Sequence, residues 1–166
     1  MEKDLLEEIY ARYYRDVYLY AYSLCKNHHL AQEICSDTFF KALISCDDNT
    51  AAIDYWLLRV CKNCFIDQWR RVRRRKEQPL EEIPLQAENS DPLEQILQQE
   101  ERRRLYQAIL QLPEAAREVV LLFYFHGFSG QQIAALTGRS PGAVRTLLYR
   151  ARSQLKELLD PKTKKG

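Results

Sequence analysis

The chain has 166 residues, of which 46% are hydrophobic and 29% charged, a balance typical of a folded globular protein rather than a disordered one. Only five glycines and six prolines occur, too few for a turn-rich β-sandwich or a collagen-like repeat. The longest apolar run, residues 119–125, has seven residues, whereas a helix needs roughly 20 to span a bilayer. The net charge of +2 is too small to indicate a nucleic-acid partner by itself.

The first residues are acidic and lack both the basic and the apolar region of a secretory signal. We therefore expect a cytoplasmic protein without membrane insertion. Five cysteines stand at positions 25, 35, 46, 61 and 64. Because their number is odd and no export signal is visible, we expect free thiols.

Three amphipathic helices are predicted in the first half of the chain. Apolar residues recur at steps of three and four from Asp4 to Lys26, from Leu30 to Ser45, and from about Ala51 to Arg75. Residues 46–50 have the composition of a loop. The third helix ends in the segment 70–76, where six of seven residues are basic, and cations in a last turn suit the helix dipole.

The segment 77–92 is predicted to be an interdomain linker. It holds three prolines and few large apolar residues, so it cannot bury enough surface to offset the entropy of its ordering. Residues 77–101 include eight acidic side chains and no Lys or Arg, whereas residues 139–166 include eight basic and two acidic ones. Together with the basic run before the linker, the charge pattern is basic, acidic, basic along the chain.

The second half begins with two further predicted helices, Leu93 to Leu112 and Glu114 to Phe125. The apolar run 119–125 has the composition of a strand as well. No second strand candidate exists to pair with it, so we interpret it as a buried helix, apolar on all sides.

A helix-turn-helix is predicted from Ser129 onward. Ser129 is a good N-cap for a short helix over 130–137, and a glycine-containing turn follows at 137–139. Ser140 followed by Pro141 starts a longer helix that runs to Leu159, because serine caps the free N–H groups and proline is tolerated at the first helical position. Its predicted buried face consists of Val144, Leu147, Leu148, Ala151, Leu155 and Leu158, and its polar face of Arg145, Thr146, Tyr149, Arg150 and Arg152. An ordinary helical hairpin with a solvated basic face is the alternative.

These motifs carry a resemblance to a known family. Residues 112–124, 128–134 and 142–152 resemble region 4 of bacterial sigma-70 family factors. Residues 30–42 are similar to region 2.2, and residues 56–71 to regions 2.3 and 2.4. Since only regions 2 and 4 are present, the chain resembles the extracytoplasmic-function (ECF) subgroup.

The resemblance implies an all-α protein of two small helical domains joined by a flexible acidic linker. The implied organisation is a region 2 bundle at 1–76, the linker at 77–92, a region 4 helix-turn-helix at 93–160, and a basic tail at 161–166. It further implies a sigma factor that directs core RNA polymerase to specific promoters for transcription initiation, under the control of an anti-sigma factor. Region 2 would bind the clamp helices and the opened -10 strand, and region 4 the flap and the -35 duplex.

The resemblance also implies roles for individual residues. For the -35 element, it places Arg145, Thr146 and Tyr149 at bases and Arg139, Arg150 and Arg152 at phosphates, since arginine can bond guanine bidentately whereas phosphate contacts only position the protein. Asn63, Asp67, Arg70 and Arg71 match the helix that binds the -10 strand. The loop 46–50 and the start of the third helix match the part that captures a flipped base. Trp69, among these arginines, is a candidate for stacking on bases, or else for packing against the linker or the first helix. The implied polymerase-binding residues are Glu33, Asp37, Phe39, Phe40 and Lys41.

Other classes of function were weighed against this interpretation. The pair Cys61 and Cys64 has the spacing of half a zinc site, but no second ligand pair is evident, so we expect small buried hydrophobes and no metal or cofactor. No catalytic motif occurs, and we expect no enzymatic activity. A free-standing helix-turn-helix repressor that binds a palindrome as a homodimer, and a redox or metal sensor that uses the cysteines, stay as alternatives.

Overall fold

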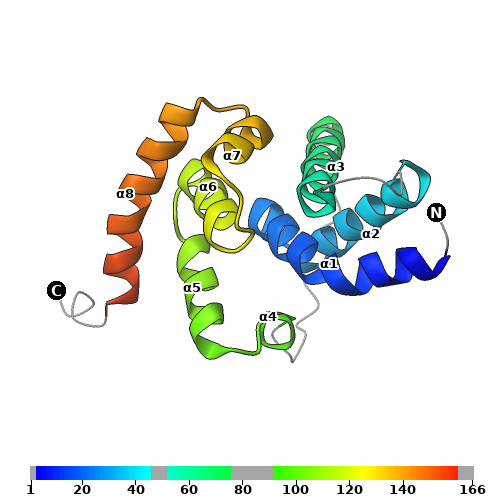
Figure 1. Cartoon of the computed structure of the whole chain (residues 1–166), viewed down its shortest axis with the longest axis horizontal. Helices are drawn as coiled ribbons and strands as arrows, with labels where there is room; N and C mark the ends of the chain where they lie inside the picture. The colour runs from blue at the N-terminus through cyan, green and yellow to red at the C-terminus, as the bar shows by residue number, and fades with distance from the viewer. Residues whose placement is uncertain (1–2, 46–51, 76–91, 161–166) are drawn as a thin grey trace. The chain divides into compact units, whose positions relative to one another are not determined.

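The computed structural model describes residues 3–45, 52–75 and 92–160. These residues form helices and no strand, so the all-α prediction is confirmed for them (Figure 1). The chain divides into two compact units, Met1–Asp91 and Pro92–Gly166. The predicted base-capturing loop 46–50, most of the predicted linker and the basic tail lie outside the described residues.

The first unit consists of α1 (Lys3–Cys25), α2 (His28–Ser45) and α3 (Ile53–Arg75), which pack against one another. All three predicted helices are confirmed, with ends shifted by no more than two residues. The sharp turn between α1 and α2 needs Lys26 in the left-handed region, at φ 52°. The Asn27 side chain then accepts a hydrogen bond from the Leu30 backbone N–H at 2.9 Å, which caps the start of α2.

A ladder of tyrosines joins α1 to α2. Tyr10, Tyr14, Tyr18 and Tyr22 stand four residues apart, and consecutive ring centroids are 5.1, 6.2 and 6.0 Å apart. Phe39 of α2 packs on two of these rings, with centroids 5.0 and 6.5 Å away. The position of Phe39 is therefore set by the core of the first unit.

The second unit begins with two helices where the sequence predicts one. The predicted helix Leu93 to Leu112 is broken into α4 (Pro92–Ile96) and α5 (Glu100–Leu110). A continuous helix would place Glu100 and Glu101 on the same stripe as the buried Leu93 and Leu97, since they lie three and four residues after Leu97. The chain turns instead, and Arg103 donates a hydrogen bond at 3.0 Å to the Leu97 carbonyl.

The apolar run forms the centre of the second unit. It lies in α6 (Glu114–Tyr124), where Val119, Val120, Leu121 and Leu122 are fully buried, so the helical interpretation is confirmed. The expectation of burial on all sides is wrong for the end of the run, because Tyr124 is exposed. Helix α6 packs against α5, α7 and α8, and each helix covers one side of it.

The predicted helix-turn-helix is present as α7 (Gly130–Thr137) and α8 (Pro141–Leu159). The Ser129 hydroxyl accepts from the Gln132 backbone N–H at 3.2 Å, and the Gln132 side chain accepts from the Ser129 N–H at 2.9 Å, which completes a capping box. Gly138 ends α7 in the left-handed conformation at φ 72°. The Ser140 hydroxyl accepts from the Ala143 N–H at 3.1 Å, so the second predicted cap is confirmed as well.

The cap of α8 gives a stability prediction. We expect Ser140→Ala to lower the free energy of unfolding of the second unit by about 1 kcal/mol, because the Ala143 N–H loses its acceptor. Ser153→Ala is the matched control, since Ser153 is exposed in the interior of the same helix, where alanine is the better helix former. Urea unfolding followed by circular dichroism measures both variants. Equal destabilisation by both would contradict a capping role.

Candidate nucleic-acid and polymerase interfaces

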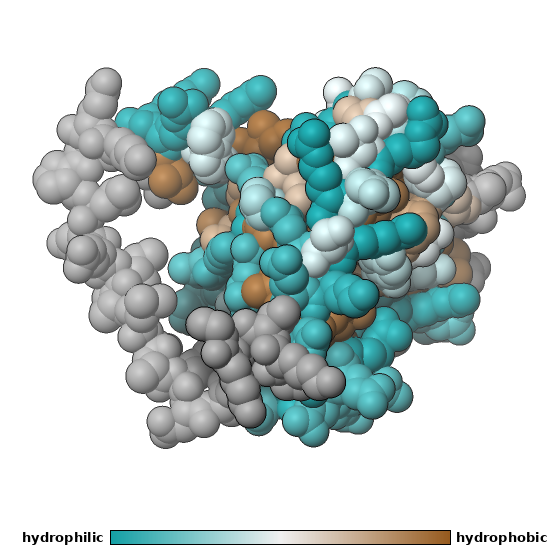
Figure 2. Space-filling model, turned by 90° about the vertical axis from the view of Figure 1, so that its left-hand side faces the viewer, coloured by the Kyte–Doolittle hydropathy of each residue, from teal (hydrophilic) through white to brown (hydrophobic). Residues whose placement is uncertain are grey.

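The outer face of α8 is polar and exposed. Arg145, Tyr149 and Arg152 stand four and three residues apart and form one stripe, and Tyr149 is 77% exposed. Seen from the side on which α8 lies in Figure 1, the surface is mostly hydrophilic (Figure 2). All six residues predicted to bind the -35 element are exposed: Arg139, Arg145, Thr146, Tyr149, Arg150 and Arg152.

The buried face of α8, opposite the polar one, is narrower than predicted. Val144, Leu148, Ala151 and Leu155 are buried, whereas Leu147 and Leu158 are only half-buried. The prediction of full burial is wrong for these two leucines. They flank the buried stripe, at positions where a helix that packs on a single layer keeps partial contact with water.

Two contacts modify the predicted roles on α8. The Thr146 hydroxyl donates to the Gly142 carbonyl of its own helix at 3.1 Å, so toward a base it offers its lone pairs and its methyl group. The Arg152 Nε–H donates to the Tyr124 hydroxyl of α6 at 2.9 Å. Tyr124 could not be predicted from the sequence, because no periodicity connects residues that lie 28 positions apart on different helices.

The residues predicted to bind the -10 strand lie on α3. Asn63, Asp67, Arg70 and Arg71 are all exposed, toward the C-terminal half of the helix. Trp69 is also exposed, which is compatible with stacking on bases, and that role stays a prediction. The Arg73 guanidinium carbon lies 4.5 Å from the centroid of its indole ring, so one face of the ring is covered by a cation.

Helix α2 presents most of the predicted polymerase-binding residues to solvent. Glu33, Asp37, Phe40 and Lys41 are exposed, and the Phe40 ring is 62% exposed. Phe39 is only 6% exposed and packs on the tyrosines of α1, and its role in polymerase binding stays a prediction. Adjacent residues of a helix point about 100° apart, and here Phe39 faces the core whereas Phe40 faces solvent.

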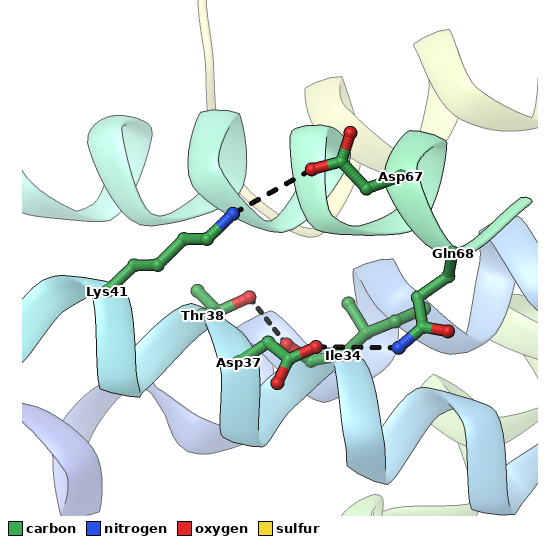
Figure 3. Close-up of polar contacts among 6 residues, drawn as sticks. All are labelled: Ile34, Asp37, Thr38, Lys41, Asp67 and Gln68. Atoms are coloured by element: carbon green, nitrogen blue, oxygen red, sulfur yellow. Dashed lines mark hydrogen bonds and ion pairs between the residues drawn. The ribbon is translucent and has the colours of Figure 1, made fainter. Parts of the chain in front are cut away.

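One groove between α2 and α3 brings together some of the predicted polymerase-binding residues and two of the predicted strand-binding residues, Asp67 and Arg71 (Figure 3). The Gln68 amide donates to the Asp37 carboxylate at 3.4 Å, and Lys41 Nζ lies 3.9 Å from the Asp67 carboxylate. Both contacts are long and exposed, so they contribute little stability and are easily replaced by a partner. The groove has a volume of about 190 Å³ and is lined by Asp37, Phe40, Lys41, Cys64, Asp67, Gln68 and Arg71. Sequence analysis missed Gln68.

A second groove, between α1 and α2, is apolar. Its volume is about 310 Å³, and it is lined by Leu6, Glu7, Tyr10, Phe39, Phe40 and Leu43. Phe40 therefore stands on the ridge between the two grooves. Exposed apolar side chains gathered in this way mark interaction sites. The sequence does contain a signal for this apolar surface. Leu43 and Ile44 form a second adjacent apolar pair after Phe39 and Phe40, so α2 has more apolar positions than its buried stripe can hold.

Most of the cysteines in the described part of the first unit are buried in its core. Cys35, Cys61 and Cys64 are buried and Cys25 is half-buried. Burial raises the pKa of each of these thiols, that of Cys35 to about 12. The thiolate is the reactive and metal-binding form, so these groups are poorly suited to sensing. Among the described residues, no cluster of three or more His, Cys, Asp or Glu side chains could hold a metal ion.

His126, at the end of α6, gives a pH prediction. Its Nε2 is buried, its ring stacks on Phe128 with centroids 6.0 Å apart, and burial lowers its pKa to about 3. The unfolded chain has the ordinary pKa near 6.5 and binds a proton below it, while the folded state stays neutral. The contribution of the neutral His126 to the free energy of unfolding is therefore fully present above pH 6.5. It is lost as the pH falls toward 3, at up to about 1.4 kcal/mol per pH unit.

Between pH 7 and pH 4.5, we expect the free energy of unfolding of His126→Phe to fall by about 2 kcal/mol less than that of the wild-type chain. Urea unfolding followed by circular dichroism measures both. Trp56 and Trp69 both lie in the first unit, so the tryptophan transition of the same samples is an internal control and should keep its midpoint. An unchanged pH dependence in the variant would show that folding does not lower the pKa of the imidazole.

None of the helices within the described ranges has the length and apolar character needed to cross a membrane.

Comparison with known proteins identifies both units. A family model described as sigma-70 region 2 matches residues 9–75, and one described as sigma-70, region 4 matches residues 102–155. An ECF sigma factor of Mycolicibacterium smegmatis, SigE, is 32% identical over 92% of this chain, which spans 61% of that protein. RNA polymerase sigma factor YlaC of Bacillus subtilis is 30% identical over 93% of this chain and 92% of its own length.

A solved structure shows the same fold. The sigma factor RpoE of Bartonella quintana, in a co-crystal with the anti-sigma factor NepR, is 26% identical and superposes with a TM-score of 0.66 over 95% of this chain and 98% of its own. The two family models match in the expected order, and YlaC is matched over 92% of its own length. The chain belongs to the sigma-70 family, in the ECF group of RNA polymerase sigma factors.

Proposed function

We propose that this chain directs core RNA polymerase to promoters by dividing the work between its two units. The second unit would read the -35 duplex with the outer face of α8. The first unit would bind the polymerase with α2 and the opened -10 strand with α3. The observation that carries the proposal is the capped helix-turn-helix whose second helix exposes all six predicted DNA-binding residues.

The chemistry of α8 supports the proposal. An α-helix fits the major groove of duplex DNA, where a guanidinium can bond guanine bidentately. Arg145 and Tyr149, near the start of α8, would reach base edges, and Thr146 would present its methyl group and lone pairs. Arg139, Arg150 and Arg152 would meet phosphates, which position the helix without specifying sequence.

The first unit would use the two grooves beside α2. Phe40 is exposed in the free chain, with the apolar groove on one side and the polar groove on the other. A bound polymerase would bury it, so that it becomes the anchor of the interface. Glu33, Asp37 and Lys41 would form its polar rim. On α3, the free face of the Trp69 ring would stack on an unpaired base, while Arg70, Arg71 and Arg73 attract the backbone.

Control by an anti-sigma factor is part of the proposal. A relative with the same fold was crystallised with the anti-sigma factor NepR. An inhibitor that covered the exposed apolar side chains of α1 and α2 would compete directly with the polymerase. The site of action of the complex would be the cytoplasm.

Transcription in vitro tests the proposed function. Core polymerase is incubated with a library of random DNA templates, with or without the purified chain, and the transcripts are sequenced. We expect discrete start sites, preceded by common sequences at -35 and -10, only when core and chain are both present. A free-standing repressor would instead retain sequence-specific DNA without core polymerase. Absence of chain-dependent start sites would contradict the proposal.

A further inference from the structure

A contact between α6 and α8 places a residue outside the helix-turn-helix at the DNA-binding face. Tyr124 is the last residue of α6, and its hydroxyl accepts a hydrogen bond from Arg152 Nε–H at 2.9 Å. Both side chains are exposed, and Tyr124 keeps 43% of its surface in solvent. The contact therefore lies on the surface that carries the proposed phosphate-binding arginines, and not in the core.

The backbone that carries Tyr124 is firmly held. The residues one turn earlier, Val120 and Leu121, are fully buried beneath α8 and its neighbours. The Phe123 ring meets the Tyr124 ring edge to face, with centroids 5.0 Å apart. The hydroxyl is thus presented from a rigid base toward Arg152.

The hydrogen bond occupies only one donor of the Arg152 guanidinium. A guanidinium has five N–H donors, and Tyr124 takes the single Nε–H. The four N–H groups on the two Nη atoms stay available as a fork for the oxygens of one phosphate. A tyrosine hydroxyl is neutral at ordinary pH, so it orients the guanidinium without cancelling its charge, as a carboxylate would.

We propose that Tyr124 is a positioning residue that holds the Arg152 guanidinium in place for a DNA phosphate before the duplex arrives. Free arginine side chains lose rotamer entropy when they bind, and a side chain that is already oriented loses less. This inference rests on the proposed function, in which α8 binds the -35 duplex. It extends the DNA-binding surface from the helix-turn-helix to the end of α6.

The test is a double-mutant cycle in reconstituted holoenzyme. The probe is a promoter duplex selected from a random library by holoenzyme that contains the wild-type chain, and its affinity is measured over a series of salt concentrations. Tyr124→Phe removes the hydroxyl and keeps the ring. We expect it to weaken binding about two- to fivefold at every salt concentration, because the charge of Arg152 is retained. Arg152→Ala should weaken binding further and lower the salt slope by about one.

The double variant tests whether Tyr124 acts through Arg152. In the Arg152→Ala background, Tyr124→Phe should have no further effect, since the group it positions is gone. A full two- to fivefold loss in that background would show that Tyr124 acts on DNA or on the fold by itself, and would overturn the proposal. No loss with Tyr124→Phe alone would overturn it as well.

Arg145→Ala in the same assay separates this inference from the proposed function. If Arg145→Ala and Arg152→Ala both leave promoter binding unchanged, α8 does not bind the duplex, and both proposals fall. If both weaken binding while Tyr124→Phe does not, only the positioning role falls. Equal helical circular dichroism for all variants confirms that each is folded.

Discussion

Phe40→Asp should reduce the affinity for core RNA polymerase by about 100-fold or more. Phe40 stands on the ridge between the two grooves beside α2, and a polymerase bound there would bury it. A carboxylate buried without a partner in an apolar interface costs several kcal/mol, and about 3 kcal/mol corresponds to a factor of 100. Fluorescence titration of labelled chain with core polymerase measures the loss.

Ile44→Asp is the matched control for this prediction. Ile44 is an exposed apolar residue of the same helix, but it lines neither groove. We expect it to change the affinity by less than about threefold. Asp37→Arg, which reverses a charge in the polar groove, should also abolish co-purification with core polymerase, at a cost to folding of no more than about 0.5 kcal/mol. Polymerase binding unimpaired in both Phe40→Asp and Asp37→Arg would remove this face of α2 from the interface.

Arg145→Ala and Tyr149→Ala should change which -35 sequences are preferred. A lost bidentate or apolar base contact is worth about 1 to 3 kcal/mol of discrimination, so preference at the contacted base pair should fall by roughly five- to 150-fold. Selection of promoter sequences from a random library by each variant holoenzyme measures the change. The altered base pairs should differ between the two variants, because Arg145 and Tyr149 lie one turn apart on α8.

Arg152→Ala is the comparison variant for base readout. It should weaken all sequences alike, since a phosphate contact carries no sequence information. If all three substitutions weakened every sequence equally, the outer face of α8 would be a phosphate-binding surface only. Base readout would then have to come from another element.

Local structure in this protein is determined by the sequence. The three helices of the first unit follow from apolar residues at steps of three and four, and their predicted ends were within two residues of the observed ones. The two caps of the helix-turn-helix follow from Ser129 and Ser140, whose hydroxyls bond N–H groups only three residues away. Such interactions depend on neighbours along the chain, so a single sequence contains all the information they need.

The surfaces of the candidate sites were only partly visible in the sequence. The outer face of α8 was predicted correctly, because exposure on one side of a helix follows from burial on the other. On α2, however, periodicity could not tell which of Phe39 and Phe40 faces solvent. The tyrosine ladder of α1 decides this by packing on Phe39, and that contact joins separate helices.

Contacts between helices were decided by the tertiary structure alone. The approach of Lys41 to Asp67 and the hydrogen bond from Arg152 to Tyr124 both connect residues whose spacing along the chain carries no periodic signal. Each depends on the angle and register at which two elements pack, and many different core residues can produce the same register. The sequence by itself therefore determined the helices, their caps and the family, whereas packing determined which side chains meet at the grooves and at the DNA-binding face.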